Sequence, residues 1–139
     1  MKYIISIFIF FQFCGATAQD LADYQWKNRL LIIMTDTEKN KLYQSQLNDV
    51  RTAASGMEER KFIVIRLTPN YQITGINSEV KHKARLDYND LKEKAESFEI
   101  LLVGLDGSIK LRKRSLLTHQ ELFTIVDRMP MRRSEIEKN

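Results

Sequence analysis

The sequence contains very little cysteine and histidine, the residue types that most often form disulfides, thiol redox sites and zinc sites. One of its 139 residues is cysteine, Cys14, and two are histidine, His82 and His119. A single thiol cannot close an internal disulfide, and two histidines far apart in the chain do not suggest a zinc site. We therefore expect no cofactor and no metal, and we place both histidines on solvated helices or loops.

Proline and glycine are also scarce, at two and five residues. The chain has no glycine-rich phosphate loop, no internal repeat and no low-complexity segment. A length of 139 residues with 43% hydrophobic and 29% charged residues is typical of one ordinary globular domain. The length and composition thus predict a single domain.

The longest hydrophobic run lies at the start, in "MKYIISIFIFFQFCGATA". A basic residue, a mostly apolar stretch and the ending Ala16-Thr17-Ala18 are typical of a secretory signal peptide. We predict a signal peptide over residues 1–18, with cleavage between Ala18 and Gln19. The apolar stretch is shorter than the roughly 18 residues of a membrane anchor. Lipid attachment at Cys14 is a weaker alternative because its neighbours are bulky aromatics.

Cleavage would leave an exported chain, periplasmic or secreted, with no cysteine and no stable membrane insertion. The net charge of +4 falls by one with the loss of Lys2. That excess is too small and too mixed to indicate nucleic-acid binding. The partner we expect is an unidentified envelope or extracellular molecule, for which an anionic one is an option.

Apolar patterns predict the first half of the fold. "RLLIIMT" at 29–35 has the continuous apolar character of a strand buried on both faces. A helix follows, with Asp36 or Thr37 as N-cap and Gly56 as its stop. Its apolar stripe consists of Tyr43, Leu47, Val50, Ala54 and Met57. "KFIVIRLT" at 61–68 predicts a second, parallel strand that Pro69 ends.

The second half is less regular. Residues 70–86 support no assignment, and Asp87 is expected to cap a helix from Tyr88 to about Ser97. "EILLVG" and "SIKLRKR" flank Asp106-Gly107, which indicates a hairpin. Thr118 and Glu121 form a capping box that opens the last helix.

The resulting order, β-α-β-α-β-β-α, is that of the thioredoxin fold. We predict an α/β three-layer sandwich with a mixed four-stranded sheet and the last strand at an edge. The domain would span 19–136, with a disordered tail at 137–139.

Three strings, "DYQWKNRLLII", "LLVGLDGSIKLR" and "DRMPMRRSEI", resemble a family catalogued as a domain of unknown function. That family occurs in exported bacterial proteins and at the C-terminus of animal sushi-repeat and matrix proteins. The resemblance runs from about Leu21 to Ile136, and "MPMRR" is its most specific element. It implies a thioredoxin-like or peroxiredoxin-like fold and transfers no catalytic residues.

The first strand-to-helix junction bears on catalysis. Thioredoxin-like enzymes hold a nucleophilic cysteine there, with its pKa lowered by the helix N-terminus. This chain has Thr35, Asp36 and Thr37 instead, and Ser97 stands where a proline usually precedes the third strand. We interpret the junction as a helix cap, and a vestigial anion pocket is the alternative.

Basic residues of the last predicted strand alternate with apolar ones. Lys110, Arg112 and Arg114 would point to one face, where charge protects a sheet edge against strand addition. The alternative is an anion-binding or partner-binding ridge that Arg128, Arg132 and Arg133 would extend.

The string "MPMRR" has two interpretations. In the structural one, Pro130 sends the chain away extended, and Arg132 and Arg133 stabilise the C-terminus of the last helix. In the other, these two arginines bind an anionic partner.

Two functions follow from these patterns. The favoured hypothesis is a non-catalytic interaction module without thiol redox activity. The alternative is a thiol-independent enzyme, an oxidoreductase or a hydrolase, that works around Thr35–Thr37 at the strand ends where α/β sheets commonly bind ligands.

Overall fold

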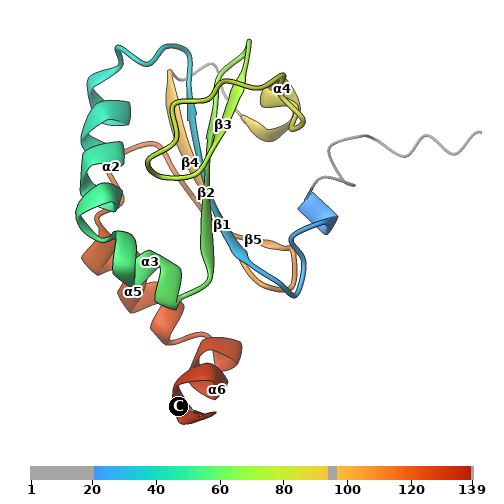
Figure 1. Cartoon of the computed structure of the whole chain (residues 1–139), viewed down its shortest axis with the longest axis vertical. Coiled ribbons are helices and arrows are strands. Elements are labelled where there is room, and N and C mark those ends of the chain that lie inside the picture. Colours follow the sequence, from blue (N-terminus) through green and yellow to red (C-terminus); the bar gives the residue numbers. More distant parts are fainter. Residues whose placement is uncertain (1–20, 94–96, 139) are drawn as a thin grey trace, which may run out of the picture.

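The structure, a computed structural model, describes residues 21–93 and 97–138 (Figure 1). The predicted signal peptide and its cleavage site lie outside these residues. The strands are β1 (Arg29–Thr35), β2 (Phe62–Leu67), β3 (Gln72–Thr74), β4 (Phe98–Val103) and β5 (Ile109–Lys113). The helices are α2 (Lys41–Thr52), α3 (Ala54–Glu59), α4 (Tyr88–Leu91), α5 (His119–Asp127) and α6 (Pro130–Lys138).

The strands form one mixed sheet in the order β3-β2-β1-β4-β5. β1 and β2 are parallel, whereas β4 is antiparallel to both β1 and β5. This order confirms the predicted thioredoxin-like sandwich, with β5 at an edge. The predicted strand count of four was wrong, because β3 adds a fifth strand beside β2. Its three residues, two of them polar, are too few to show a periodic pattern.

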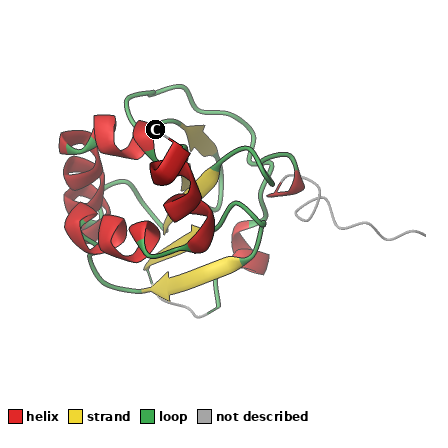
Figure 2. Cartoon of the chain, turned by 90° about the horizontal axis from the view of Figure 1, so that it is seen from below, coloured by secondary structure: helices red, strands yellow, loops and turns green. Residues whose placement is uncertain are grey.

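Helices cover both faces of the sheet, which explains the unbroken apolar run of β1. Leu31 and Ile33 belong to the core beneath α2, α3 and α5. Leu30, Ile32 and Met34 belong to the core that includes Leu91 of α4. Figure 2 shows the longer helices gathered on one side of the strands. Alternate β1 side chains thus enter opposite cores, and every residue of the strand is buried.

The first helical region differs from its prediction at both ends. Asn40, rather than Asp36 or Thr37, caps α2. The apolar stripe continues through Met57, but a break at Ala53 divides it between α2 and α3. Gly56 lies inside α3 and does not end the helix. The chain turns from α3 into β2 at Lys61, whose φ of 57° is unusual for a residue with a side chain.

Other predicted boundaries have mixed outcomes. Asp87 caps α4 as predicted, but this helix ends at Leu91 instead of continuing to Ser97, and residues 94–96 are outside the described range. The hairpin between β4 and β5 is confirmed, with Gly107 at φ 81°. Thr118 caps α5 and accepts a hydrogen bond from the Glu121 N–H, which confirms that start.

The chain after α5 does not leave in an extended form. Pro130 is the first residue of α6, where its missing N–H costs no helical hydrogen bond. The helix continues to Lys138, so Glu137 and Lys138 are helical and not part of a disordered tail. Contacts of Arg132 and Glu135 hold this helix against the body of the domain. None of the helices in the described ranges has the length and apolarity of a membrane span.

Candidate functional site

The junction after β1 uses its polar groups internally. Thr35 is fully buried, and its Oγ1 donates to the Thr37 carbonyl over 2.8 Å. The Asp36 N–H donates to the Ser97 carbonyl over 3.1 Å. The Thr37 Oγ1 accepts a hydrogen bond of 3.3 Å from the Lys39 N–H. The side chain at the thioredoxin nucleophile position is therefore bonded within its own turn.

The N-terminus of α2 is also occupied by a side chain. Asn40 Oδ1 accepts from the N–H groups of Leu42 and Tyr43 over 2.9 and 3.2 Å. Asn40 Nδ2 donates to Ser97 Oγ over 3.1 Å, which ties the helix start to the turn before β4. These amides are among those that a helix N-terminus would offer to an anion. The sequence-based interpretation as a helix cap fits this arrangement, although a different residue makes the cap.

Glu38 connects the junction to the segment after β2. Burial and a hydrogen bond with Glu38 raise the pKa of Tyr71 to about 12. Lys81 Nζ lies 3.5 Å from the Glu38 carboxylate and 4.5 Å from the centre of the Tyr71 ring. Two residues of the segment 70–86, where the sequence supported no assignment, thus contact Glu38 beside the junction.

Two of the three basic residues proposed for the β5 ridge neutralise a buried carboxylate. Glu99 has no exposed surface and forms an ion pair with Arg112. Arg114 Nε lies 3.4 Å from Glu99 Oε2, and Arg112 Nη1 donates to the Leu91 carbonyl over 2.7 Å. Both arginines therefore have partners inside the domain.

Lys110 is separated from these two arginines by an irregularity in the strand. The register between β4 and β5 shifts at Leu102/Val103, so the three basic residues do not form the regular alternation that we predicted. Lys110 Nζ lies 2.8 Å from Asp106 Oδ2 in the hairpin. Hydrogen bonds from Lys110 and Ser108 lower the pKa of Asp106 to about 2.

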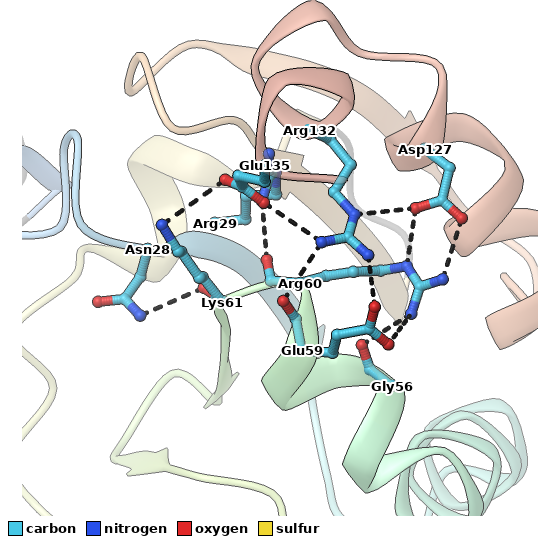
Figure 3. Close-up of polar contacts among 9 residues, drawn as sticks. All are labelled: Asn28, Arg29, Gly56, Glu59, Arg60, Lys61, Asp127, Arg132 and Glu135. Atoms are coloured by element: carbon cyan, nitrogen blue, oxygen red, sulfur yellow. Dashed lines mark hydrogen bonds and ion pairs between the residues drawn. The ribbon is translucent and has the colours of Figure 1, made fainter. Parts of the chain in front are cut away.

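Arg132 belongs to a charged network at the end of β1 that lies opposite the Thr35–Thr37 junction (Figure 3). We call it the C-terminal ion cluster, and it comprises Arg29, Glu59, Arg60, Asp127, Arg132 and Glu135. Arg132 is 3% exposed, with Nη2 2.8 Å from Glu59 Oε1 and Nε 3.2 Å from Asp127 Oδ1. Arg60 binds the same Asp127 through two nitrogens, over 3.0 and 2.9 Å. The cluster thus joins α3, α5 and α6.

Glu135 extends the cluster to β1. Its Oε2 lies 3.3 Å from Nη1 of the buried Arg29, which also donates to the Arg60 carbonyl over 2.9 Å. Burial of Glu135 opposes ionisation, but the hydrogen bond and charge of Arg29 outweigh it and lower the Glu135 pKa. Hydrogen bonds from Arg60 and Arg132 likewise lower the pKa of Asp127. The cluster therefore favours both carboxylates in their charged form.

The two arginines of "MPMRR" are in different environments. Arg133 is exposed, as is Arg128, and within the described ranges the Arg133 side chain has no ion pair. Arg132 is enclosed by carboxylates, so only Arg133 of this pair is presented to solvent.

Sequence reasoning overlooked the charges buried in the strands. Arg29, Arg66 and Glu99 lie within or next to apolar runs and are almost completely buried. A charge embedded in such a run was the available signal, because burial of a charge requires a partner. His119, predicted to be solvated, is half-buried, and its Nδ1 lies 2.9 Å from Asp49 Oδ1. Among the described residues, no group of His, Cys, Asp and Glu side chains is arranged to hold a metal.

The sheet order and helix layers define a thioredoxin-like domain with threonine at its first junction. Residues 20–135 match the family described as "Domain of unknown function (DUF4174)", and the chain belongs to this family. The match includes the junction, the β5 residues and Arg132.

Animal proteins named for sushi repeats contain a similar segment. The "Sushi repeat-containing protein SRPX" of Rattus norvegicus is 34% identical over 128 residues, covering 86% of this chain. Those of Mus musculus and Homo sapiens are 33% identical over the same length. The match covers 27% of each of these relatives, so the chain spans about a quarter of their length.

Proposed function

We propose that this protein is an exported, non-catalytic interaction domain that uses a thioredoxin-like scaffold to bind another molecule. The observation that carries the proposal is the closed junction: the Thr35 hydroxyl is buried and bonded to Thr37. A threonine nucleophile would need a free hydroxyl next to a base, with substrate able to reach it. The alternative, a thiol-independent enzyme at Thr35–Thr37, would require this turn to open.

The internal ion pairs also limit where an anionic partner would bind. Arg112 and Arg114 share Glu99, and Arg132 shares carboxylates from two helices. Arg133, exposed and without an ion pair in the described ranges, is the member of the predicted basic set best placed for an anionic partner, whereas exposed Lys110 already pairs with Asp106. In this proposal the other three arginines serve the scaffold.

A capture experiment tests the proposal. Residues 19–139 are immobilised and exposed to an envelope or extracellular fraction of the source cells, and retained proteins are identified by mass spectrometry. Thr35→Val, which removes the hydroxyl and keeps the side-chain shape, is the matched variant. We expect both proteins to retain the same unmodified partner. No enrichment over bare resin would contradict the proposal, as would a partner that only the wild type converts.

Export is part of the proposal and has its own test. We propose that the mature chain begins at Gln19, without lipid, because Ala16-Thr17-Ala18 follows the apolar run. The intact mass of the native protein is expected to equal that of residues 19–139, or that mass less ammonia if Gln19 cyclises. A mass that includes residues 1–18 would contradict export by cleavage. A diacylglycerol on Cys14 would replace it with lipoprotein anchoring.

A further inference from the structure

A cavity of about 270 Å³ lies between β3 and the segment that precedes β1. Six described residues line it, none of them acidic: Tyr24, Gln72, Thr74, His82, Lys83 and Arg85. His82 pairs with Gln72 on the side of β3 away from β2, through two main-chain hydrogen bonds of 2.9 Å. The cavity is thus bounded by β3, by the segment 82–85 that pairs with it, and by Tyr24.

Gln72 contributes a buried amide to the wall of the cavity. The residue is 6% exposed, and its Oε1 accepts hydrogen bonds from the N–H groups of Arg85 and Leu86 over 3.2 and 3.3 Å. Its Nε2 donates to Thr74 Oγ1 over 3.2 Å. Because an amide nitrogen carries two hydrogens, one N–H of this side chain has no hydrogen-bond partner within the described residues. The acceptor of Gln72 is therefore used, and a donor is left beside the cavity.

The basic residues around the cavity differ in how far their charges are neutralised. Arg85 Nη2 lies 3.4 Å from Asp23 Oδ2, and this carboxylate offsets the charge of the guanidinium. Lys81 Nζ lies 3.5 Å from the Glu38 carboxylate, and Lys81 does not line the cavity. Lys83 lines the cavity, is exposed and forms no ion pair in the described part of the chain. The uncompensated positive charge at the cavity is therefore that of Lys83.

We propose that this cavity binds a small organic anion that also carries hydroxyl groups, such as a sugar acid or a sugar phosphate. The ammonium of Lys83 and the remaining amide N–H of Gln72 are donors without a protein acceptor, and they are complementary to an anionic group. The hydroxyl groups of Tyr24 and Thr74 can each donate and accept, as the hydroxyl groups of a ligand do. The volume of about 270 Å³ lies just below the usual range for larger organic ligands, roughly 300–1,000 Å³, so the ligand is small.

Uncharged and apolar ligands are less complementary to these residues. A neutral molecule placed against Lys83 would displace water from the ammonium without supplying an opposite charge, which costs free energy. An apolar molecule would lack matching surface, because no Leu, Ile, Val, Met or Phe is among the described residues that line the cavity. The chemistry of the walls therefore favours a ligand rich in acceptors, with a negative charge facing Lys83.

Calorimetric titration of residues 19–139 tests the proposal at neutral pH and constant ionic strength. The probes are glucose 6-phosphate and glucuronate, with glucose as the uncharged counterpart of both. We expect at least one acidic sugar to bind roughly tenfold more tightly than glucose, because a hydrogen bond to a charged group is stronger than one to a neutral group. The ratio of the two affinities distinguishes phosphate from carboxylate as the preferred group. Absence of binding by both acidic sugars, or equal binding of glucose, would overturn the proposal.

Two lysines of the same segment provide a matched pair of variants. Lys83→Gln and Lys81→Gln remove the same charge from exposed positions two residues apart, but only Lys83 lines the cavity. We expect roughly fivefold weaker binding of the acidic sugar to the first variant and unchanged binding to the second. Equal losses would assign the binding to the overall charge of the protein and overturn the proposal. In the wild type, the main-chain amide NMR signals of Gln72 and His82 should shift on binding, and shifts confined to other elements would overturn the proposed location.

This inference goes beyond the proposed function, since Arg133 does not line the cavity and the ligand is a small molecule instead of a captured protein. The two proposals can therefore fail separately. A domain that captures a partner but binds neither acidic sugar would keep its interaction role and lose this site. A domain that binds an acidic sugar but captures no partner would keep the site and lose the interaction role.

Discussion

Several charged side chains of this domain are buried and paired with charges of the opposite sign. Arg132 and Arg133 are adjacent in sequence and equal in charge, yet only Arg132 is surrounded by carboxylates. Glu99 is enclosed by Arg112 and Arg114 in the same way. Removal of one member of a buried ion pair is costly because the remaining charges lose their compensation.

The two arginines therefore allow a direct comparison. Arg132→Ala is expected to lower the free energy of unfolding by roughly 2–3 kcal/mol, less than a fully buried pair because its partners are partly exposed. Arg133→Ala is expected to change it by no more than about 0.5 kcal/mol. Urea unfolding of both variants measures the difference. Equal losses would show that Arg132 is not a structural residue.

A second pair of variants tests the buried carboxylate on β4. Glu99→Gln leaves two arginines without full compensation and is expected to cost roughly 3 kcal/mol. Glu93→Gln removes an exposed carboxylate that contacts the same arginines and should cost less than about 1 kcal/mol. Thermal unfolding at neutral pH compares them. A Glu99 variant as stable as wild type would mean that the buried ion pairs are not needed for folding.

At the scale of elements, α6 is unusual because ion pairs, and not apolar contacts, hold it against the rest of the domain. Arg132 is its buried residue, and Ile136 is 49% exposed. Asp127 and Glu135 both have lowered pKa values in the folded state. An ordinary carboxyl group has a pKa of about 4, and above that pH the two ionised carboxylates contribute fully to the stability of the fold. This contribution is lost as the pH falls through their lowered pKa values.

Docking of α6 should therefore weaken in acid. The difference in unfolding free energy between wild type and the double variant Asp127→Asn/Glu135→Gln is expected to be largest at pH 6 and to shrink steadily towards pH 2.5. Urea unfolding across that range measures it, with Glu137→Gln, exposed on α6, as the control. If the difference in unfolding free energy stayed constant with pH, these carboxylates would not contribute to holding α6 in place.

The elements also show what the sequence could predict. β1, β2, β4 and β5 were recognised because each is a clear apolar run or half of a hairpin. β3 was not, since Gln72 and Thr74 leave a single apolar residue between them. Pro130 was interpreted as a helix terminator, but the same residue is equally suited to begin a helix. Only contacts between distant elements, such as those of Glu135 with Arg29, distinguish the two roles.

For the candidate site, the sequence indicated which residues are present but not which residues their side chains contact. The sequence located the junction, but the predicted caps Asp36 and Thr37 were wrong: Asn40 caps α2, and the turn at Thr35–Thr37 is held by its own hydrogen bonds. The sequence placed Lys110, Arg112 and Arg114 in the last strand, but it gave no sign that the carboxylate partner of the two arginines lies on the neighbouring strand.

At the scale of the whole molecule, the fold is that of thioredoxin-like redox enzymes, but the side chains at the first strand-to-helix junction are hydrogen-bonded within the junction. Thr35 bonds to Thr37, Asn40 caps α2, and Glu38 connects the junction to Tyr71 and Lys81. These interactions close the position at which a thioredoxin-like enzyme reacts.

The central claim is that this scaffold binds without catalysing, and a turnover assay tests it most directly. Residues 19–139 are incubated with insulin and a thiol reductant, and separately with hydrogen peroxide and a thiol donor, beside Thr35→Val. We predict that neither protein raises the rate of disulfide reduction or peroxide consumption above the buffer rate. A rate that increases in proportion to wild-type protein and disappears in Thr35→Val would contradict the account.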